Sequence, residues 1–169
     1  MKFNQKIAKH LSGIGLSAAL VLAGAGTVSY YEGVSNKAYL DPIGIWTICY
    51  GETKGVNKGD YKTDEECLDS LAEELTEHHK KMVMYIKTPI SEKEEAAYLS
   101  FTYNVGVGAF SKSTLLKKLN SGDRVGACSQ LLCWDKAGGK KLKGLTLRRQ
   151  SENKLCLEGV QESNETSTK

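Results

Sequence analysis

EGVSNKAYLDPIGIWTICYG, residues 32–51, is the stretch that decides the fold. Its apolar and aromatic residues are interrupted by Pro42 and Gly44, and it ends at Gly51, with Gly55 a few positions later. Short apolar runs broken by proline and glycine are typical of short strands joined by turns. We therefore expect a small twisted hairpin region over residues 37–58.

The same stretch carries two carboxylates and a hydroxyl group, at Glu32, Asp41 and Thr47. Hydrolysis of a glycosidic bond needs one carboxyl group that protonates the leaving oxygen and a second, ionised one that orders water or attacks. Glu32 ends an apolar run, where burial would raise its pKa, and we assign it as the general acid. Asp41 precedes Pro42 in a solvated turn, and we assign it as the base.

Thr47 would orient the water molecule that Asp41 activates. The alternative interpretation of this spacing is an ordinary turn, because Asp-Pro begins many turns that have no catalytic role. Context beyond the hairpin is needed to choose between the two.

Several motifs, in sequence order, supply that context because they resemble the phage lysozyme (endolysin) family, glycoside hydrolase family 24. Besides residues 32–51 they are SFTYNVGVGAF at 100–110, STLL at 113–116, WDKAGG at 134–139 and GLTLRR at 144–149. The similarity spans residues 30–160 and is strongest to lambdoid endolysins with a signal-anchor-release segment. It implies an α+β, mainly helical, lysozyme-like fold with two lobes, a cleft and a small β hairpin region.

The resemblance implies a bacteriolytic muramidase that cuts the β-1,4 bond between N-acetylmuramic acid and N-acetylglucosamine in peptidoglycan. Glu32 matches the family's acid, Asp41 its second carboxylate and Thr47 its third catalytic residue. The family is regarded as inverting, which makes Asp41 a base and not a nucleophile. Glu52 is a departure, since many members have His after the hairpin glycine. We expect altered stability or pH optimum there, because a hairpin-to-helix pair with that His is missing.

Other residues of the motifs are candidates for contact with the substrate. Aromatic and amide side chains line sugar clefts, which favours Tyr103 and Asn104, although core packing explains them equally well. Ser113 is similar to a family position near the cleft, with helix capping as its plain alternative. Arg148 or Arg149 would form an ion pair with Glu32, as a family arginine does, and the sequence does not distinguish the two.

Residues 1–31 carry Lys2, Lys6 and Lys9 followed by an uncharged run from Leu11 to Tyr31. Basic residues before an apolar run orient it with the N-terminus in the cytoplasm and the remainder exported. The run is rich in Gly, Ala and Ser, so it can just span a bilayer with little apolar free energy to hold it there.

We therefore expect a signal-anchor-release segment that tethers the enzyme to the inner membrane and later frees it into the periplasm, when the membrane potential collapses. Two alternatives remain at this stage. Ala23-Gly24-Ala25 has the form of a signal-peptidase site, which would give an ordinary secreted enzyme. A permanent anchor is the other.

Five cysteines follow the N-terminal segment, and in an oxidising periplasm they can pair with one left over. We prefer Cys49 with Cys67, joining the hairpin to the next helix, and Cys128 with Cys156, joining two C-terminal helices. Cys133 then stays free. The alternative is a set of buried thiols without bridges.

Helix starts are predicted at Thr63 and Ser91, each with a Glu three residues later that completes a capping box. Ser113, Asp123 and Thr146 are candidates for later starts. The expected domains are a signal-anchor segment at 1–31, a catalytic domain at 32–160 and a polar disordered tail at 161–169.

The net charge of +3 is mild and excludes a strongly basic nucleic-acid binder. Neither a cofactor nor a metal site is expected, because zinc-type cysteine spacing is absent from the sequence. The expected partners are peptidoglycan, the inner membrane, host export machinery and a holin, for a chain that acts as a monomer.

Two other functions compete with the muramidase. A lytic transglycosylase uses one acid and an internal sugar hydroxyl group, and the presence of Asp41 and Thr47 argues against it. A membrane-tethered wall-binding protein with a degenerate site would bind peptidoglycan without lysing cells.

Overall fold

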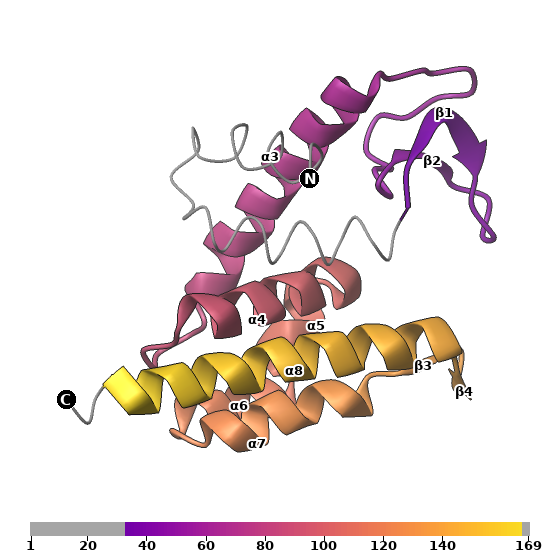
Figure 1. Cartoon of the computed structure of the whole chain (residues 1–169). Helices are drawn as coiled ribbons and strands as arrows, with labels where there is room; N and C mark the ends of the chain where they lie inside the picture. Colours follow the sequence, from indigo (N-terminus) through magenta and orange to yellow (C-terminus); the bar gives the residue numbers. More distant parts are fainter. Residues whose placement is uncertain (1–32, 167–169) are drawn as a thin grey trace.

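The computed structural model describes residues 33–166, which form two small antiparallel strand pairs and a set of helices (Figure 1). The signal-anchor segment predicted for residues 1–31 lies outside this range, as do Glu32 and residues 167–169. Within residues 33–166, none of the helices has both the length and the apolar character needed to cross a membrane.

The hairpin consists of β1 (Ser35–Leu40) and β2 (Trp46–Cys49), paired antiparallel with Tyr39 opposite Thr47. Its turn closes through Asp41, whose N–H donates to Ile45 O at 2.9 Å and whose carbonyl accepts from Gly44 N–H at 3.0 Å. Gly44 has φ +84°, a conformation that L side chains rarely adopt. The hairpin predicted from the pattern of apolar residues and turn formers is thus confirmed.

Helix α3 (Asp64–Val83) follows the hairpin and is long enough, at about 30 Å, to reach from it to the other helices. It begins with the predicted capping box, in which the Thr63 side chain accepts from Glu66 N–H and the Glu66 carboxylate accepts from Thr63 N–H. Figure 1 shows the hairpin beside one end of α3 and the remaining helices gathered at its other end.

The remaining elements form the larger, helical lobe. They are α4 (Glu92–Val105), α5 (Val107–Lys112), α6 (Thr114–Asn120), α7 (Arg124–Gln130), the 3-10 helix η1 (Leu131–Cys133), β3 (Lys136–Ala137), β4 (Lys140–Lys141) and α8 (Lys143–Thr166). Helix α4 packs against both α3 and α8, and α6 packs against α7. The predicted mainly helical, lysozyme-like α+β plan is confirmed for the residues described.

Three of the later helix starts are confirmed by side-chain caps. Ser91 forms a capping box with Glu94, Ser113 accepts from Leu116 N–H, and Asp123 accepts from Gly126 N–H. The start at Thr146 was wrong, because α8 already begins at Lys143.

The disordered tail predicted from residue 161 was also wrong for residues 161–166, which continue α8. Their polar side chains have partners on other helices: Glu162 forms an ion pair with Lys93, and Ser163 accepts a hydrogen bond from Arg124 at 3.0 Å. Contacts between helices therefore stabilise a sequence whose composition alone indicated disorder.

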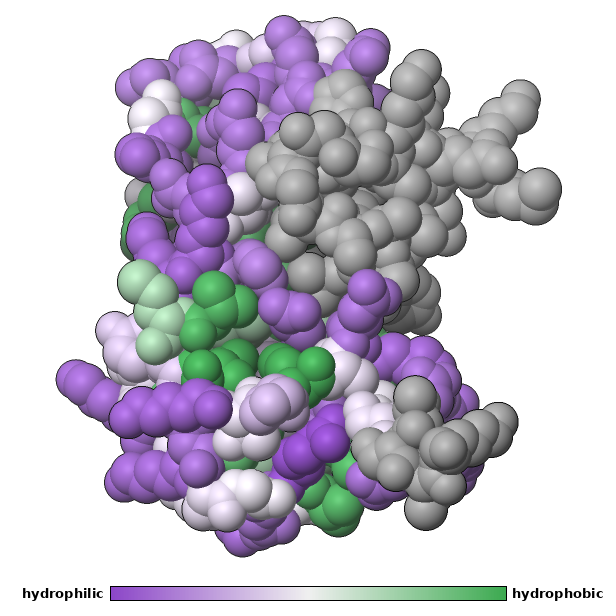
Figure 2. Space-filling model, turned by 90° about the vertical axis from the view of Figure 1, so that its left-hand side faces the viewer, coloured by the Kyte–Doolittle hydropathy of each residue, from purple (hydrophilic) through white to green (hydrophobic). Residues whose placement is uncertain are grey.

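One face of the molecule combines a polar surface with a band of apolar side chains at mid-height (Figure 2). It is the side on which the connection from α3 to α4 lies in Figure 1, and that connection carries the exposed Met84 and Tyr85.

Both predicted disulfides are present. Cys49–Cys67 joins the end of β2 to the first turn of α3, and Cys128–Cys156 joins α7 to α8. Cys133 is the leftover thiol and is exposed, as expected. The alternative of buried thiols without bridges is therefore excluded.

Each disulfide closes a loop, of 18 and 28 residues, and so restricts the unfolded chain. We expect the double substitution Cys128→Ala/Cys156→Ala to lower the free energy of unfolding of the full-length protein by about 3 kcal/mol. Urea denaturation measures this change. Cys133→Ala is the matched control and should leave the urea midpoint nearly unchanged; equal effects of the two replacements would contradict the argument.

Candidate active site

Of the three residues assigned to catalysis, the structure describes Asp41 and Thr47, whereas Glu32 lies one residue before the described range. Asp41 sits at the turn of the hairpin, where its Oδ1 accepts hydrogen bonds from the N–H groups of Ile43 at 3.0 Å and Ile45 at 2.8 Å. The carboxyl group is thereby held in one orientation while remaining partly exposed.

Thr47 is almost fully buried on β2, with 4% of its surface exposed. Its hydroxyl group donates to Ile45 O at 3.1 Å, and the same carbonyl accepts from Asp41 N–H. The structure therefore places Asp41 and Thr47 on the two sides of one turn, linked through Ile45.

A pocket of about 420 Å³ lies between the hairpin side and the helices. The loop after β2 contributes one wall, α3 another and the end of α4 the third; the lining residues are Tyr50, Gly51, Thr53, Lys54, Glu74, Glu77, His78, Tyr103 and Asn104. Tyr103 and Asn104, both predicted to contact the substrate, thus line this pocket.

Ser113, the third substrate candidate, is not among the lining residues. It is 4% exposed, and its Oγ accepts from Leu116 N–H at 3.0 Å while donating to Phe110 O at 2.7 Å. These bonds cap α6, which supports the plain structural role that the sequence left as the alternative.

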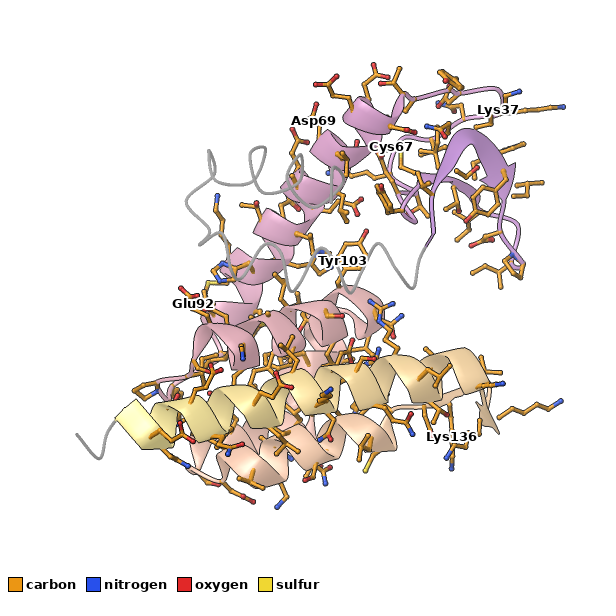
Figure 3. All side chains as sticks on the ribbon, in the orientation of Figure 1. Lys37, Cys67, Asp69, Glu92, Tyr103 and Lys136 are labelled. Atoms are coloured by element: carbon orange, nitrogen blue, oxygen red, sulfur yellow. A yellow bond between two sulfur atoms is a disulfide. The ribbon has the colours of Figure 1, made fainter. Side chains whose placement is uncertain are left out.

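Tyr103 connects the three walls of the pocket. It projects from α4 into the space beside α3 (Figure 3). Its hydroxyl group lies 2.8 Å from Glu74 Oε2 and 3.3 Å from Tyr50 O, and its ring centroid is 5.2 Å from that of His78. A single side chain therefore joins the hairpin loop, α3 and α4.

Glu74 lies in the wall of the pocket, and its pKa is raised. Burial raises its pKa, and the negative charge of Glu52 acts in the same direction, whereas the hydrogen bond from Tyr103 lowers the pKa. His78 and Lys62 also lower it, to a lesser extent. Glu74, Glu77 and His78 were not predicted from the sequence as site residues, although their spacing of three and four residues places them on one face of a helix.

Arg148 and Arg149 are both buried, at 3% and 0% exposure, around the fully buried Glu152. Arg148 donates to Ser100 O at 3.2 Å, on α4. Arg149 donates from Nη2 to Asn104 Oδ1 at 2.8 Å. Asn104 is one of the residues that line the pocket.

Known proteins resemble this chain in sequence and in structure. The model of the phage lysozyme family matches residues 29–152. The chain belongs to the phage lysozyme family. This makes it a glycoside hydrolase of the lysozyme kind, an endolysin that serves lysis of the bacterial host and acts on peptidoglycan.

Individual relatives agree with the family assignment. The chain is 44% identical over 145 residues to the SAR-endolysin of Bacteriophage PS119, covering 85% of this chain and 87% of the relative. It is 42% identical over 159 residues to the SAR-endolysin of Bacteriophage PS34, covering 94% and 95%. The active form of the P1 phage endolysin Lyz superposes with a TM-score of 0.77 at 26% identity, covering 89% of this chain and 90% of that one.

Within this phage lysozyme Glu52, predicted from the sequence to depart from the family pattern, has an ion-pair partner. Lys62 Nζ lies 2.7 and 2.9 Å from the two Glu52 carboxylate oxygens and donates to Ser70 Oγ on α3 at 2.8 Å. The hairpin side is thus connected to α3 through Lys62. The negative charge expected from Glu52 is compensated by Lys62, although Glu52 still raises the pKa of Glu74.

The raised pKa of Glu74 predicts a pH-dependent stability. A carboxyl group whose pKa is higher in the folded protein contributes stability below its unfolded pKa, about 4.3, and this contribution is lost as the pH rises through the folded pKa. We therefore expect the wild type to lose free energy of unfolding relative to Glu74→Gln as the pH rises above about 4.3.

Urea denaturation of both proteins across the acidic range tests this expectation. Glu77→Gln is the matched control, because its carboxyl group lies one turn away on the same helix and is 66% exposed. A constant difference between wild type and Glu74→Gln at every pH would refute the burial argument.

Proposed function

We propose that this phage lysozyme is an N-acetylmuramidase, with Glu32 as general acid, Asp41 as base and Thr47 as the residue that orients water. Its substrate would be the β-1,4 bond between N-acetylmuramic acid and N-acetylglucosamine. The observation that supports this most is the hairpin turn, which holds an oriented, partly exposed carboxyl group beside a threonine hydroxyl group. Glu32 precedes the first strand by three residues.

The contacts of Thr47 suggest how the water would be held. Because its hydroxyl proton is donated to Ile45 O, its oxygen is left to accept a hydrogen bond. A water molecule that donates one proton to Thr47 Oγ1 and the other to an Asp41 oxygen would present its lone pair to the anomeric carbon. As Asp41 takes a proton from the water, Glu32 would protonate the leaving oxygen, which completes an inverting hydrolysis.

The pocket beside the hairpin would bind the sugar chain. Tyr103 and Asn104 would contact the substrate there, since an aromatic ring and an amide side chain suit sugar faces and hydroxyl groups. Arg148 and Arg149 are both candidates for an ion pair with Glu32. We favour Arg149, because it donates a hydrogen bond to Asn104 in the pocket wall.

Export and regulation form the second part of the proposal. Residues 1–31 would insert in the inner membrane with the N-terminus in the cytoplasm, hold the catalytic domain in the periplasm in an inactive state, and leave the bilayer when the membrane potential collapses. The similarity to SAR-endolysins, which extends over 94% of the chain in one case, supports this. A holin would cause the membrane potential to collapse. The released enzyme would act as a monomer.

The chemical assignment predicts that Glu32→Gln and Asp41→Asn each lower the rate of peptidoglycan hydrolysis by at least about 100-fold, because each removes one half of the acid and base pair. Asn at position 41 can still accept the hydrogen bonds of the turn, so the fold should persist. Glu73→Gln, an exposed carboxyl group on α3, is the control and should keep wild-type activity.

Analysis of the products separates the competing enzymes. Hydrolysis by a muramidase produces a reducing N-acetylmuramic acid end, whereas a lytic transglycosylase produces a 1,6-anhydro end. Full activity of Glu32→Gln would overturn the assignment of the acid, and peptidoglycan binding without any product would indicate the inert wall-binding protein.

The release hypothesis predicts that an uncoupler moves the uncleaved full-length chain from the membrane fraction to the soluble fraction of expressing cells and triggers lysis. Glu32→Gln should move in the same way without lysing the cells, so that release and chemistry are scored separately. A shortened soluble product would mean signal-peptide cleavage, and retention in the membrane would mean a permanent anchor.

A further inference from the structure

We infer that Glu152 is a positioning residue that, through Arg149, presents the amide N–H groups of Asn104 to an acceptor oxygen of the substrate. The acceptor would be a carbonyl oxygen such as that of the acetamido group of an amino sugar. The inference deepens the proposed function and rests on it, because it names a recognition contact in the pocket proposed to bind the sugar chain.

Glu152 lies at the centre of a buried cluster between α4 and α8. It has no exposed surface; its Oε1 accepts from Ser100 Oγ at 2.7 Å and from Arg148 Nε at 3.2 Å. Its other oxygen, Oε2, lies 3.1 Å from Arg149 Nε in an ion pair. A buried guanidinium group is costly unless an opposite charge compensates it, and Glu152 supplies such a charge to Arg149.

Arg149 carries the effect of Glu152 outward to the pocket. Its guanidinium carbon lies 4.9 Å from the centroid of the Phe101 ring, and the side chain is fully buried. Contacts of Nε with Glu152 and of one face with Phe101 orient the planar group. Nη2 then donates to Asn104 Oδ1 at 2.8 Å.

This hydrogen bond fixes the orientation of the side-chain amide of Asn104. A guanidinium group only donates, so the atom of Asn104 that faces it must be the carbonyl oxygen. The NH2 group is therefore directed away from Arg149 on a residue that is exposed and lines the pocket. Asn104 consequently offers the substrate donors, and the complementary ligand atom is an acceptor.

Asn104→Asp tests this polarity with little change of shape. The carboxylate keeps an oxygen for Arg149 but replaces the NH2 donors with a second acceptor. We expect KM for soluble, uncrosslinked oligomers of the peptidoglycan disaccharide to rise about tenfold, as the loss of one good hydrogen bond implies, with a smaller change in kcat.

Glu152→Gln tests the positioning role. It removes the charge that holds Arg149, so KM should rise by a similar factor, and the double variant Asn104→Asp/Glu152→Gln should be little worse than either single variant. Additive effects in this cycle would show that the two residues act independently.

Glu94→Gln is the matched control for destabilisation. Glu94 is likewise fully buried and paired with an arginine, Arg124, but it lies at the opposite end of α4 from Asn104. Both glutamine variants should lower the urea midpoint, while only Glu152→Gln should raise KM in conditions where the protein is folded.

The outcomes are distinguishable. An unchanged KM in Asn104→Asp overturns the inference while leaving the muramidase intact, because wild-type hydrolysis and its loss in Glu32→Gln test that function separately. An equal rise of KM in Glu94→Gln would show that Glu152 contributes only stability and would also overturn it.

Discussion

Helix α4 is buried on every side from Ala96 to Thr102, between α3 and α8, and the positions of the other elements are set against it. A helix without a solvated face cannot rotate or slide without opening the core. Its last turn therefore delivers Tyr103 and Asn104 to a fixed place beside the hairpin loop. Helix α4 thus runs through the rigid interior of the helical lobe and ends in the wall of the pocket.

Polar groups reinforce the apolar contacts of Ile48 and Tyr50 in connecting the hairpin side to α3 and α4 around the pocket. Lys62 joins Glu52 to Ser70, and the Tyr103 hydroxyl group lies between Glu74 and the Tyr50 carbonyl. Such contacts are directional, and two of them involve a glutamate. Together with Cys49–Cys67 they hold a hairpin that has too few residues to form a core of its own.

Local chemistry explains which features were predictable from the sequence. The hairpin, the caps at Thr63, Ser91, Ser113 and Asp123, and both disulfides depend on residue types at short spacing or on simple element order. The extension of α8 beyond residue 160 was missed because it depends on Lys93 and Arg124, which are distant in the sequence. Glu74 and Glu152 were missed for the same reason: on a helix a glutamate usually faces solvent, and only tertiary packing buries Glu152 and partly buries Glu74. Lys62 as the partner of Glu52 likewise required the folded loop.

The two disulfides have a consequence for where the protein matures. All four paired cysteines lie in the part that would be exported, and bacterial cytoplasm keeps thiols reduced. A copy still in the cytoplasm would therefore have an unbridged hairpin and an unbridged α7–α8 pair, and would be the more readily unfolded and degraded form. Disulfides would then form only after translocation. Only molecules that have reached the compartment of their substrate would gain the stability that the disulfides provide.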